Sequence, residues 1–231
     1  MLEQYGQEDY HVRLDWGPTG ARAGRADLSV VVDVLSFSTS VCIAVERGMR
    51  VCPSPWKGAE AAAFAERHDA VLAVGRADAA KDRAMLAPTL SPAGLLAGPV
   101  APRLVLPSPN GSTIAASLRD TGSVVAIGCL RNATSTAARL AMALDAGLSV
   151  AVIAAGERWA EDDSLRPALE DHLGAGAILA ALTRFGHDDE LSPEAAAAAG
   201  LFQAAGDRLV EWLRGCVSGR ELTERGFGSD V

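Results

Sequence analysis

The chain has 231 residues and a formal net charge of −8, and 49% of its residues are hydrophobic whereas only 5% are aromatic. This acidic balance argues against a nucleic-acid partner, because such binding requires clustered Lys and Arg that neutralise phosphates. A local group of arginines can still bind a small anionic molecule in an acidic protein.

Short apolar runs rich in β-branched residues alternate with longer, Ala-rich stretches along the first two thirds of the chain. The runs predict strands at residues 12–16, 28–34, 50–52, 70–74, 103–106, 123–127 and 149–154. The stretches between them predict helices at residues 39–48, 57–68, 112–119 and 133–146. This alternation is typical of parallel strands joined by crossover helices, and near-continuous apolar runs such as residues 30–32 fit burial on both faces of a sheet.

The last third changes character, because from Leu165 onward the pattern predicts helices alone. They are expected at residues 167–185, 193–214 and, as a short one, 221–225. We therefore predict an α/β protein of three layers, α/β/α, with a mostly parallel sheet and a helical C-terminal third. One domain of residues 1–231 is expected, the alternative being two similar α/β halves that meet near residue 100.

The cysteine spacing and the hydropathy pattern indicate where in the cell the protein is expected and whether a membrane is among its partners. None of the CxxC spacings of zinc ribbons or thioredoxin-like sites occurs among Cys42, Cys52, Cys129 and Cys216. Residues 1–9 lack the apolar core of a signal peptide, and no apolar run approaches the about 20 residues of a membrane span. We expect a reduced, cytoplasmic protein with no membrane partner. A homodimer is the expected assembly only because symmetric dimers are common.

Four predicted strands end in a turn of small polar residues. The segments that contain these strand ends and turns are residues 32–39, 106–113, 127–134 and 154–158. In an open parallel sheet such turns share one edge, and ligands bind there, where the strand order reverses. This edge is therefore the expected place for a functional site.

Carboxylates stand in unusually apolar surroundings near two of these turns. Asp33 follows the most apolar strand, Glu157 follows another, and Glu170 and Asp171 open a helix built from small apolar residues. Carboxylates rarely enter such segments unless they are paired or bind a metal ion, and hard oxygen ligands suit Mg²⁺. All four are candidate metal ligands, and Asp33, Glu170 and Asp171 are candidate catalytic residues. The alternative is that these residues cap helices or favour a helix dipole.

The second turn, with Asn110 and Gly111, has the composition of an anion-binding loop. Glycine lets the backbone approach a ligand closely, and the free N–H groups of a helix start attract anions. The alternative is an ordinary N-cap. The loop is not a P-loop, because GxxxxGK is absent. The hydroxyl candidates for substrate binding in these turns are Ser38, Thr39, Ser112 and Thr113.

Arginines supply the cationic candidates for substrate binding. Arg131, followed by Asn132, lies in the third turn, and Arg can bind phosphate, carboxylate or sulfonate through two parallel hydrogen bonds. Arg158 and Arg166 flank the acidic pair, where they either bind substrate or neutralise the carboxylates, and Arg76 lies in a further turn. For Arg131 the alternative is a surface residue at the edge of a helix.

Five segments, in order and spanning roughly residues 28–231, resemble those of the 2-phosphosulfolactate phosphatase family. They are Asp33-Val34-Leu35, Pro109-Asn110-Gly111-Ser112, Gly128-Cys129-Leu130-Arg131-Asn132-Ala133, Leu169-Glu170-Asp171 to Gly176, and the ending from Ser218-Gly219-Arg220-Glu221-Leu222 to Val231. The resemblance implies a three-layer α/β/α fold and a Mg²⁺-dependent phosphomonoesterase. Its substrate would be (R)-2-phospho-3-sulfolactate, giving sulfolactate and inorganic phosphate, a step that in methanogens belongs to coenzyme M biosynthesis.

The chain departs from this family's pattern at three places. Ser36 stands where the family commonly has Arg, Gly75-Arg76 replaces Gly-Glu-Arg, and Thr89-Leu90-Ser91-Pro92 replaces Gly-Asn-Ser-Pro. These changes concern substrate recognition rather than the carboxylates. A phosphatase of another phosphorylated hydroxy acid is therefore the first alternative, and a non-catalytic anion- or nucleotide-binding protein is the second.

The predicted mechanism is metal-assisted phosphoryl transfer to water. Mg²⁺ would be held by Asp33 and the Glu170–Asp171 pair, while N–H groups around Gly111 and the Arg131 guanidinium stabilise charge on the phosphate oxygens. A carboxylate that does not bind the metal, such as Glu170, would accept the proton of the water. A covalent aspartyl-phosphate on Asp33 is the alternative.

Overall fold

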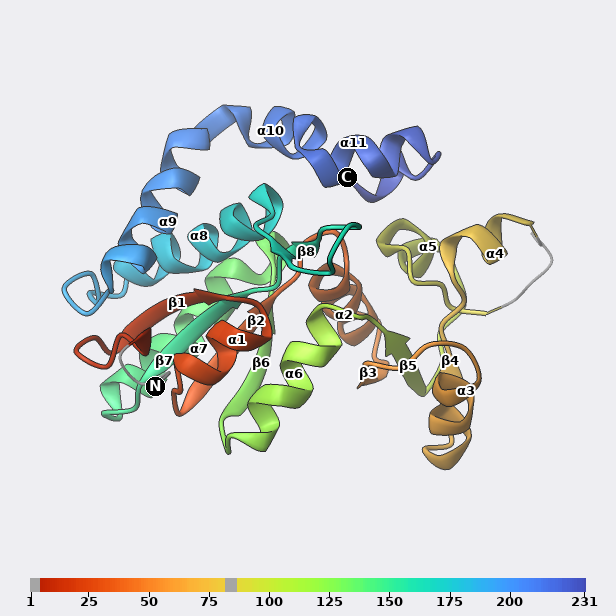
Figure 1. Ribbon diagram of the computed structural model, residues 1–231, viewed down its shortest axis with the longest axis horizontal. Helices are drawn as coiled ribbons and strands as arrows, with labels where there is room; N and C mark the ends of the chain where they lie inside the picture. Colours follow the sequence, from red (N-terminus) through yellow and green to blue (C-terminus); the bar gives the residue numbers. More distant parts are fainter. Residues whose placement is uncertain (1–4, 82–86) are drawn as a thin grey trace.

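The computed structural model describes residues 5–81 and 87–231 and contains two parallel sheets. The main sheet has the strand order β1 (Val12–Trp16), β7 (Val150–Ala154), β2 (Leu28–Val32), β6 (Val124–Gly128), as Figure 1 shows. The second sheet has the order β3 (Arg50–Ser54), β5 (Arg103–Pro107), β4 (Val71–Leu72). The predicted α/β class with mostly parallel strands is confirmed.

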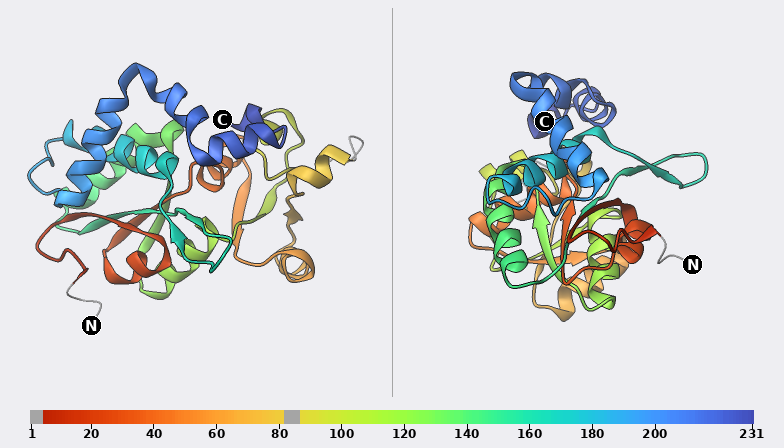
Figure 2. Two further views of the ribbon diagram at one scale, coloured as in Figure 1. Left: turned by 45° about the horizontal axis from the view of Figure 1, so that its top comes forward. Right: turned by 90° about the vertical axis from the view of Figure 1, so that its left-hand side faces the viewer.

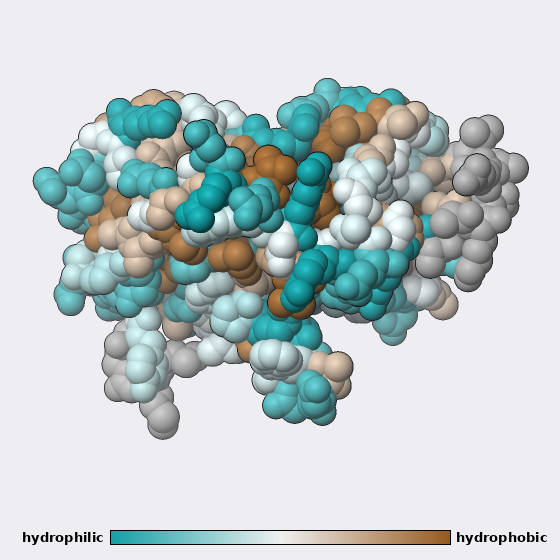
Figure 3. All heavy atoms as spheres, turned by 90° about the horizontal axis from the view of Figure 1, so that it is seen from above, coloured by the Kyte–Doolittle hydropathy of each residue, from teal (hydrophilic) through white to brown (hydrophobic). Residues whose placement is uncertain are grey.

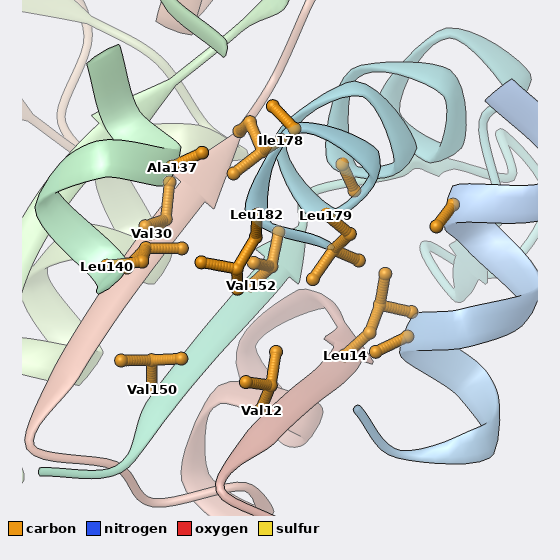
Figure 4. Close-up of a cluster of buried hydrophobic side chains, with 14 of the residues drawn as sticks. Val12, Leu14, Val30, Ala137, Leu140, Val150, Val152, Ile178, Leu179 and Leu182 are labelled. Carbon is orange, nitrogen blue, oxygen red and sulfur yellow. The ribbon is translucent and has the colours of Figure 1, made fainter. Parts of the chain in front are cut away.

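The main sheet is covered by helices on both faces, because its strands are apolar at consecutive positions. Val30 and Val152 pack with α7 (Ala133–Asp145), α8 (Leu169–Thr183) and α9 (Pro193–Ala205), the cluster drawn in Figure 4. Val31 and Ile153 point the other way, toward α1 (Gly17–Ala23) and α6 (Gly111–Asp120). Complete burial of each such side chain contributes about 1.5–3 kcal/mol. The three predicted layers thus follow from strands buried on both sides.

The second sheet has a smaller core of its own. Leu104 and Leu106 of β5 pack with Ile43 of α2 (Phe37–Glu46) and Leu95 of α5 (Pro92–Ala97). The remaining helices of this region are α3 (Gly58–Arg67) and α4 (Arg76–Lys81). The chain leaves the main sheet after β2, builds the second sheet, and returns at β6 through α6, so strands on both sides of residue 100 belong to each sheet.

The C-terminal helices extend from the main sheet toward the second one, across the top of Figure 1 and in the left view of Figure 2. After α9 come η3 (Gly206–Arg208), α10 (Leu209–Gly215), α11 (Val217–Glu224) and η4 (Gly228–Asp230). The helix predicted over residues 193–214 is therefore broken, and the break is at Gly206, whose φ of +48° is not helical. Seen from this side in Figure 3, hydrophobic atoms lie in patches among hydrophilic ones. None of the helices that the structure describes is long and apolar enough to cross a bilayer.

A short antiparallel hairpin, β8 (Glu157–Arg158) with β9 (Leu165–Arg166), projects from the body in the right view of Figure 2. This corrects the prediction that the chain is wholly helical from Leu165 onward. Two-residue strands leave no periodic apolar pattern, because each pairs only with the other. The hairpin is followed directly by α8, which carries Glu170 and Asp171 in its first turn.

Candidate active site

A cavity of about 370 Å³ lies where the carboxyl ends of β2 and β5 meet α11. Its volume is in the range of small-molecule sites. Polar and charged side chains dominate its walls. They come from the β2–α2 turn, the β3–α3 loop, the β5–α6 loop, the start of α4, the β8 strand and α11. The charged residues that line it are Asp33, Lys57, Arg76, Glu157, Glu221 and Arg225.

Asp33 is buried at the point where two helices begin. One carboxylate oxygen accepts a hydrogen bond from the backbone N–H of Phe37, the first residue of α2, at 3.1 Å. The other accepts from the N–H of Gly111, the first residue of α6, at 3.0 Å. Burial raises the pKa of Asp33, and the charge of Glu170 adds to the rise, while the two N–H donors oppose it. The helix dipoles thus stabilise a carboxylate that desolvation destabilises.

Gly111 is required by this arrangement. A Cβ atom there would lie 2.9 Å from an Asp33 oxygen and 2.2 Å from the ring of Phe37. The glycine predicted to approach a ligand therefore lets the backbone approach the Asp33 carboxylate.

Asp171 joins two loops at the carboxyl edge of the main sheet. Its two carboxylate oxygens accept backbone N–H groups, from Val34 at 2.7 Å and from Gly156 at 2.8 Å. Burial first, and then the charges of Asp33 and Glu170, raise its pKa well above its usual value. Asp171 does not line the cavity; its geometry is that of a residue that holds the turns after β2 and β7 in place.

Glu170 and Glu157 are the other acidic residues of this region. Glu170 is only 2% exposed and accepts a hydrogen bond from the thiol of Cys216 at 3.3 Å. Glu157 lines the cavity and accepts from the side-chain amide of Asn110 at 3.0 Å. Burial raises the pKa of Glu157 to about 7, with further contributions from the charges of Asp33 and Glu170. Asp33, Glu157 and Glu170 are therefore within electrostatic reach of one another.

These carboxylates suit a hard cation that takes only one or two protein ligands. In the part of the chain that the structure describes, no three His, Cys, Asp or Glu side chains are arranged to hold a metal ion by themselves. Mg²⁺ commonly takes one or two protein carboxylates and completes its shell with water and substrate phosphate. Asp33, which lines the cavity, and Glu170, which does not line it but is close enough for its charge to act on Asp33, are the donors that suit this mode.

The positive charge of the cavity comes from Arg76, Lys57 and Arg225. Arg76 donates to the buried carboxylate of Asp230 at 2.7 Å and also to the hydroxyl of Ser36. Asp230 in turn accepts from the Ser91 hydroxyl and from a backbone N–H of α5. Ser36, where the chain departs from the family pattern, and Ser91, in the altered segment 89–92, thus share one hydrogen-bond network with Arg76.

The hydroxyl candidates mainly support the loops. Ser38 donates to the backbone of Val31 at 3.1 Å, and Thr39 donates to that of Val34 at 2.7 Å. Ser112 and Thr113 donate to backbone carbonyls of the β5–α6 loop and the end of β5. None of these four side chains lines the cavity.

Most of the predicted arginines lie outside the cavity. Arg131 pairs with Glu46 at 2.9 Å on the surface, while Asn132 accepts from the N–H of Cys129. Arg158 pairs with Asp163 within the hairpin, and Arg166 lies over the ring of Trp159. Arg166 is near enough to Glu157 to lower the pKa of that carboxyl slightly.

The cavity residues that were missing from the candidates predicted from the sequence include Lys57, Ser218 and Arg225. Lys57 gave no signal, because it precedes a helix in a segment without a motif. Ser218 belongs to the Ser-Gly-Arg-Glu-Leu segment of the ending, so the resemblance already marked the region.

Comparison with known proteins adds the identity of the family. A search of the curated proteins finds no match. The family model described as 2-phosphosulpholactate phosphatase matches residues 19–231, which include every cavity residue described above. The chain therefore belongs to the 2-phosphosulpholactate phosphatase family, a family of hydrolases.

Proposed function

We propose that this protein is a Mg²⁺-dependent phosphatase that hydrolyses 2-phosphosulfolactate to sulfolactate and inorganic phosphate. The observation that carries the proposal is the Asp33 carboxylate, held by the first N–H groups of α2 and α6 on the wall of a cavity that also contains Glu157. The family match supports the substrate class. A substrate with several negative charges suits a cavity that also presents Arg76, Lys57 and Arg225.

Asp33 and Glu170 are the residues that would hold Mg²⁺ beside the phosphate. Bound there, the ion would neutralise phosphate oxygens and acidify or orient a water molecule. Without it, the negative charges of Asp33, Glu157 and Glu170 would oppose the approach of a phosphate, as their mutual effect on pKa indicates. This electrostatic argument favours a cation as part of the functional site.

Glu157 is the residue best suited to accept the proton of the attacking water. It lines the cavity, and a pKa of about 7 keeps a useful fraction of both protonation states near neutral pH. As water attacks phosphorus, the ester P–O bond breaks, one water proton passes to Glu157, and the leaving oxygen takes a proton from solvent water to become the hydroxyl of the product. Glu157 then returns its proton to solvent, which restores the enzyme. Direct attack by water is the route that follows when Asp33 holds the ion and Glu157 takes the proton, and an aspartyl-phosphate on Asp33 is its alternative.

A phosphatase of another phosphorylated hydroxy acid is the second candidate. The favouring observation is the pairing of Arg76 with Asp230 and Ser36, which reduces the positive charge available to a second anionic group of the substrate. A phosphorylated hydroxy carboxylic acid without a sulfonate group has one anionic group fewer, and it therefore requires less positive charge in the cavity.

The test is release of inorganic phosphate from 2-phosphosulfolactate and from a panel of phosphorylated hydroxy acids, with Mg²⁺ and with a chelator. We expect Mg²⁺-dependent release from the sulfonated ester. Glu157→Gln should reduce kcat by about 10²–10⁴-fold, the usual contribution of a general base. Glu161→Gln, on the exposed part of the same hairpin, is the matched control and should retain activity.

Release from other esters alone would transfer the proposal to the second candidate. No release from any ester by the folded protein would overturn both. Full activity with chelator would overturn the role of Mg²⁺ and leave the phosphatase proposal standing.

A further inference from the structure

The hydroxyl of Ser218 is buried without a hydrogen-bond partner. Ser218 is 4% exposed, and its Oγ is the buried side-chain oxygen for which the described residues offer no partner. Burying a hydroxyl unpaired is costly, so such a group in a native protein usually meets water, an ion or a ligand. Ser218 also lines the cavity that contains Asp33 and Glu157.

One face of α11 forms a wall of this cavity. Ser218, Glu221, Leu222 and Arg225 all line it, and their spacing of three, four and seven residues places them on one side of the helix. Ser218 is in the first turn of α11, and the free N–H groups of a helix start are favourable for anions. This wall thus presents a hydroxyl near its beginning and a guanidinium at its end.

The first turn of α11 is close to the acidic group. Cys216, which precedes the helix, donates its thiol hydrogen to Glu170 at 3.3 Å and accepts the N–H of Gly219. A ligand that reaches Ser218 is therefore near the carboxylates that would hold a cation, and the remaining walls bring Arg76 and Lys57 to the same space.

We propose that Ser218 is a substrate-binding residue whose hydroxyl donates a hydrogen bond to an anionic oxygen of the substrate. The identity of that substrate rests on the proposed function, but the need for an anionic oxygen rests on the cavity alone. The C-terminal helices thereby contribute a binding residue and do more than cover the two sheets.

The experiment compares Ser218→Ala with the wild type and with Thr223→Ala. Thr223 is on the same helix but outside the cavity, where its hydroxyl donates to the backbone of Gly219. Binding of inorganic phosphate and of sulfolactate is measured separately by calorimetry with Mg²⁺ present, and Tm is measured without ligand. We expect Ser218→Ala to bind at least one of the two anions roughly tenfold more weakly or worse, as loss of a hydrogen bond to a charged group predicts. Its Tm without ligand should be equal to or above that of the wild type, because the removed hydroxyl has no partner.

Weaker binding of phosphate alone would place Ser218 at the phosphoryl end, and weaker binding of sulfolactate alone would place it at the organic acid. Either result supports the proposal, even if the protein has no phosphatase activity. Affinities for both anions within about twofold of the wild type would overturn it, as that difference is below the effect of one such bond. So would a wild type that binds neither anion, or a Tm of Ser218→Ala several degrees below that of Thr223→Ala.

Discussion

At the residue scale, the acidic group divides into residues that face the cavity and residues that hold the loops. Asp33 and Glu157 line the cavity. Asp171 does not, and its two oxygens accept hydrogen bonds from backbone N–H groups of two turns. The sequence predicted one undivided set of ligands, because carboxylates after apolar strands look alike whichever partner neutralises them. The structure distinguishes them by position, because Asp33 and Asp171 each accept two backbone N–H groups but only Asp33 lines the cavity.

Asp171→Asn should destabilise the protein. The amide keeps one acceptor oxygen but presents an NH₂ group to a backbone N–H, so one buried donor loses its partner at a cost of about 1–3 kcal/mol. Urea unfolding followed by circular dichroism measures this loss. Asp189→Asn, exposed between α8 and α9, is the matched control and should lie within about 0.5 kcal/mol of the wild type. Wild-type stability with abolished turnover would instead favour the direct catalytic role predicted from the sequence.

Glu157 should make the stability of the metal-free protein depend on pH. Its pKa rises from 4.5 to about 7 on folding, so the folded state holds the proton more tightly. The resulting stabilisation is fully present below pH 4.5 and is lost as pH rises through about 7. Glu157→Gln has no carboxyl to titrate and does not lose this stabilisation. With chelator present, its Tm should therefore rise relative to that of the wild type as pH increases from about 5 to about 8. A constant difference in Tm over that range would contradict the shift.

At the element scale, the final turn η4 attaches the C-terminal helices to the second sheet. The side chain of Asp230 is fully buried and accepts from Arg76 of α4 and from Ser91 and Ala93 at the start of α5. A carboxylate at the beginning of a helix is favoured by the helix dipole, and the Arg76 guanidinium adds an opposite charge. These bonds place the face of α11 over the cavity.

Asp230→Ala should therefore weaken both stability and substrate binding. Removing one partner of a buried ion pair leaves Arg76, Ser91 and Ala93 without their acceptor, at a cost of about 2–4 kcal/mol. KM should rise because the α11 wall is no longer fixed, while kcat changes less. Chemical unfolding and steady-state kinetics measure the two effects. Asp207→Ala, exposed in η3 of the same region, should alter neither, and an unchanged free energy of unfolding in Asp230→Ala would contradict the attachment.

At the scale of the whole molecule, the cavity exists because four parts of the chain meet. The main sheet supplies Asp33 and the hairpin supplies Glu157, the second sheet supplies the β5–α6 loop, and the C-terminal helices supply Ser218 and Arg225. Neither sheet by itself supplies all the walls of the cavity. Within each sheet, parallel strands place the turns at one edge. The distance between the edges of the two sheets is set only by how the sheets pack against each other.

The layers could be predicted from the amino-acid sequence, since β7 is apolar at every position and β2 at every position but Ser29, and such strands are stable only between two layers of helices. It also identified the region of Asp33, Asn110 and Glu170, because charge and glycine at strand ends are local features that need no tertiary contact to be noticed. The place of Lys57 and Ser218 on the cavity wall was visible only in the tertiary structure, because it depends on contacts between segments far apart in the chain, and such contacts leave no periodic trace in either segment alone. The hairpin at Glu157 and the break at Gly206 were missed for a local reason, since two-residue strands and a single glycine are too short to alter a periodic pattern.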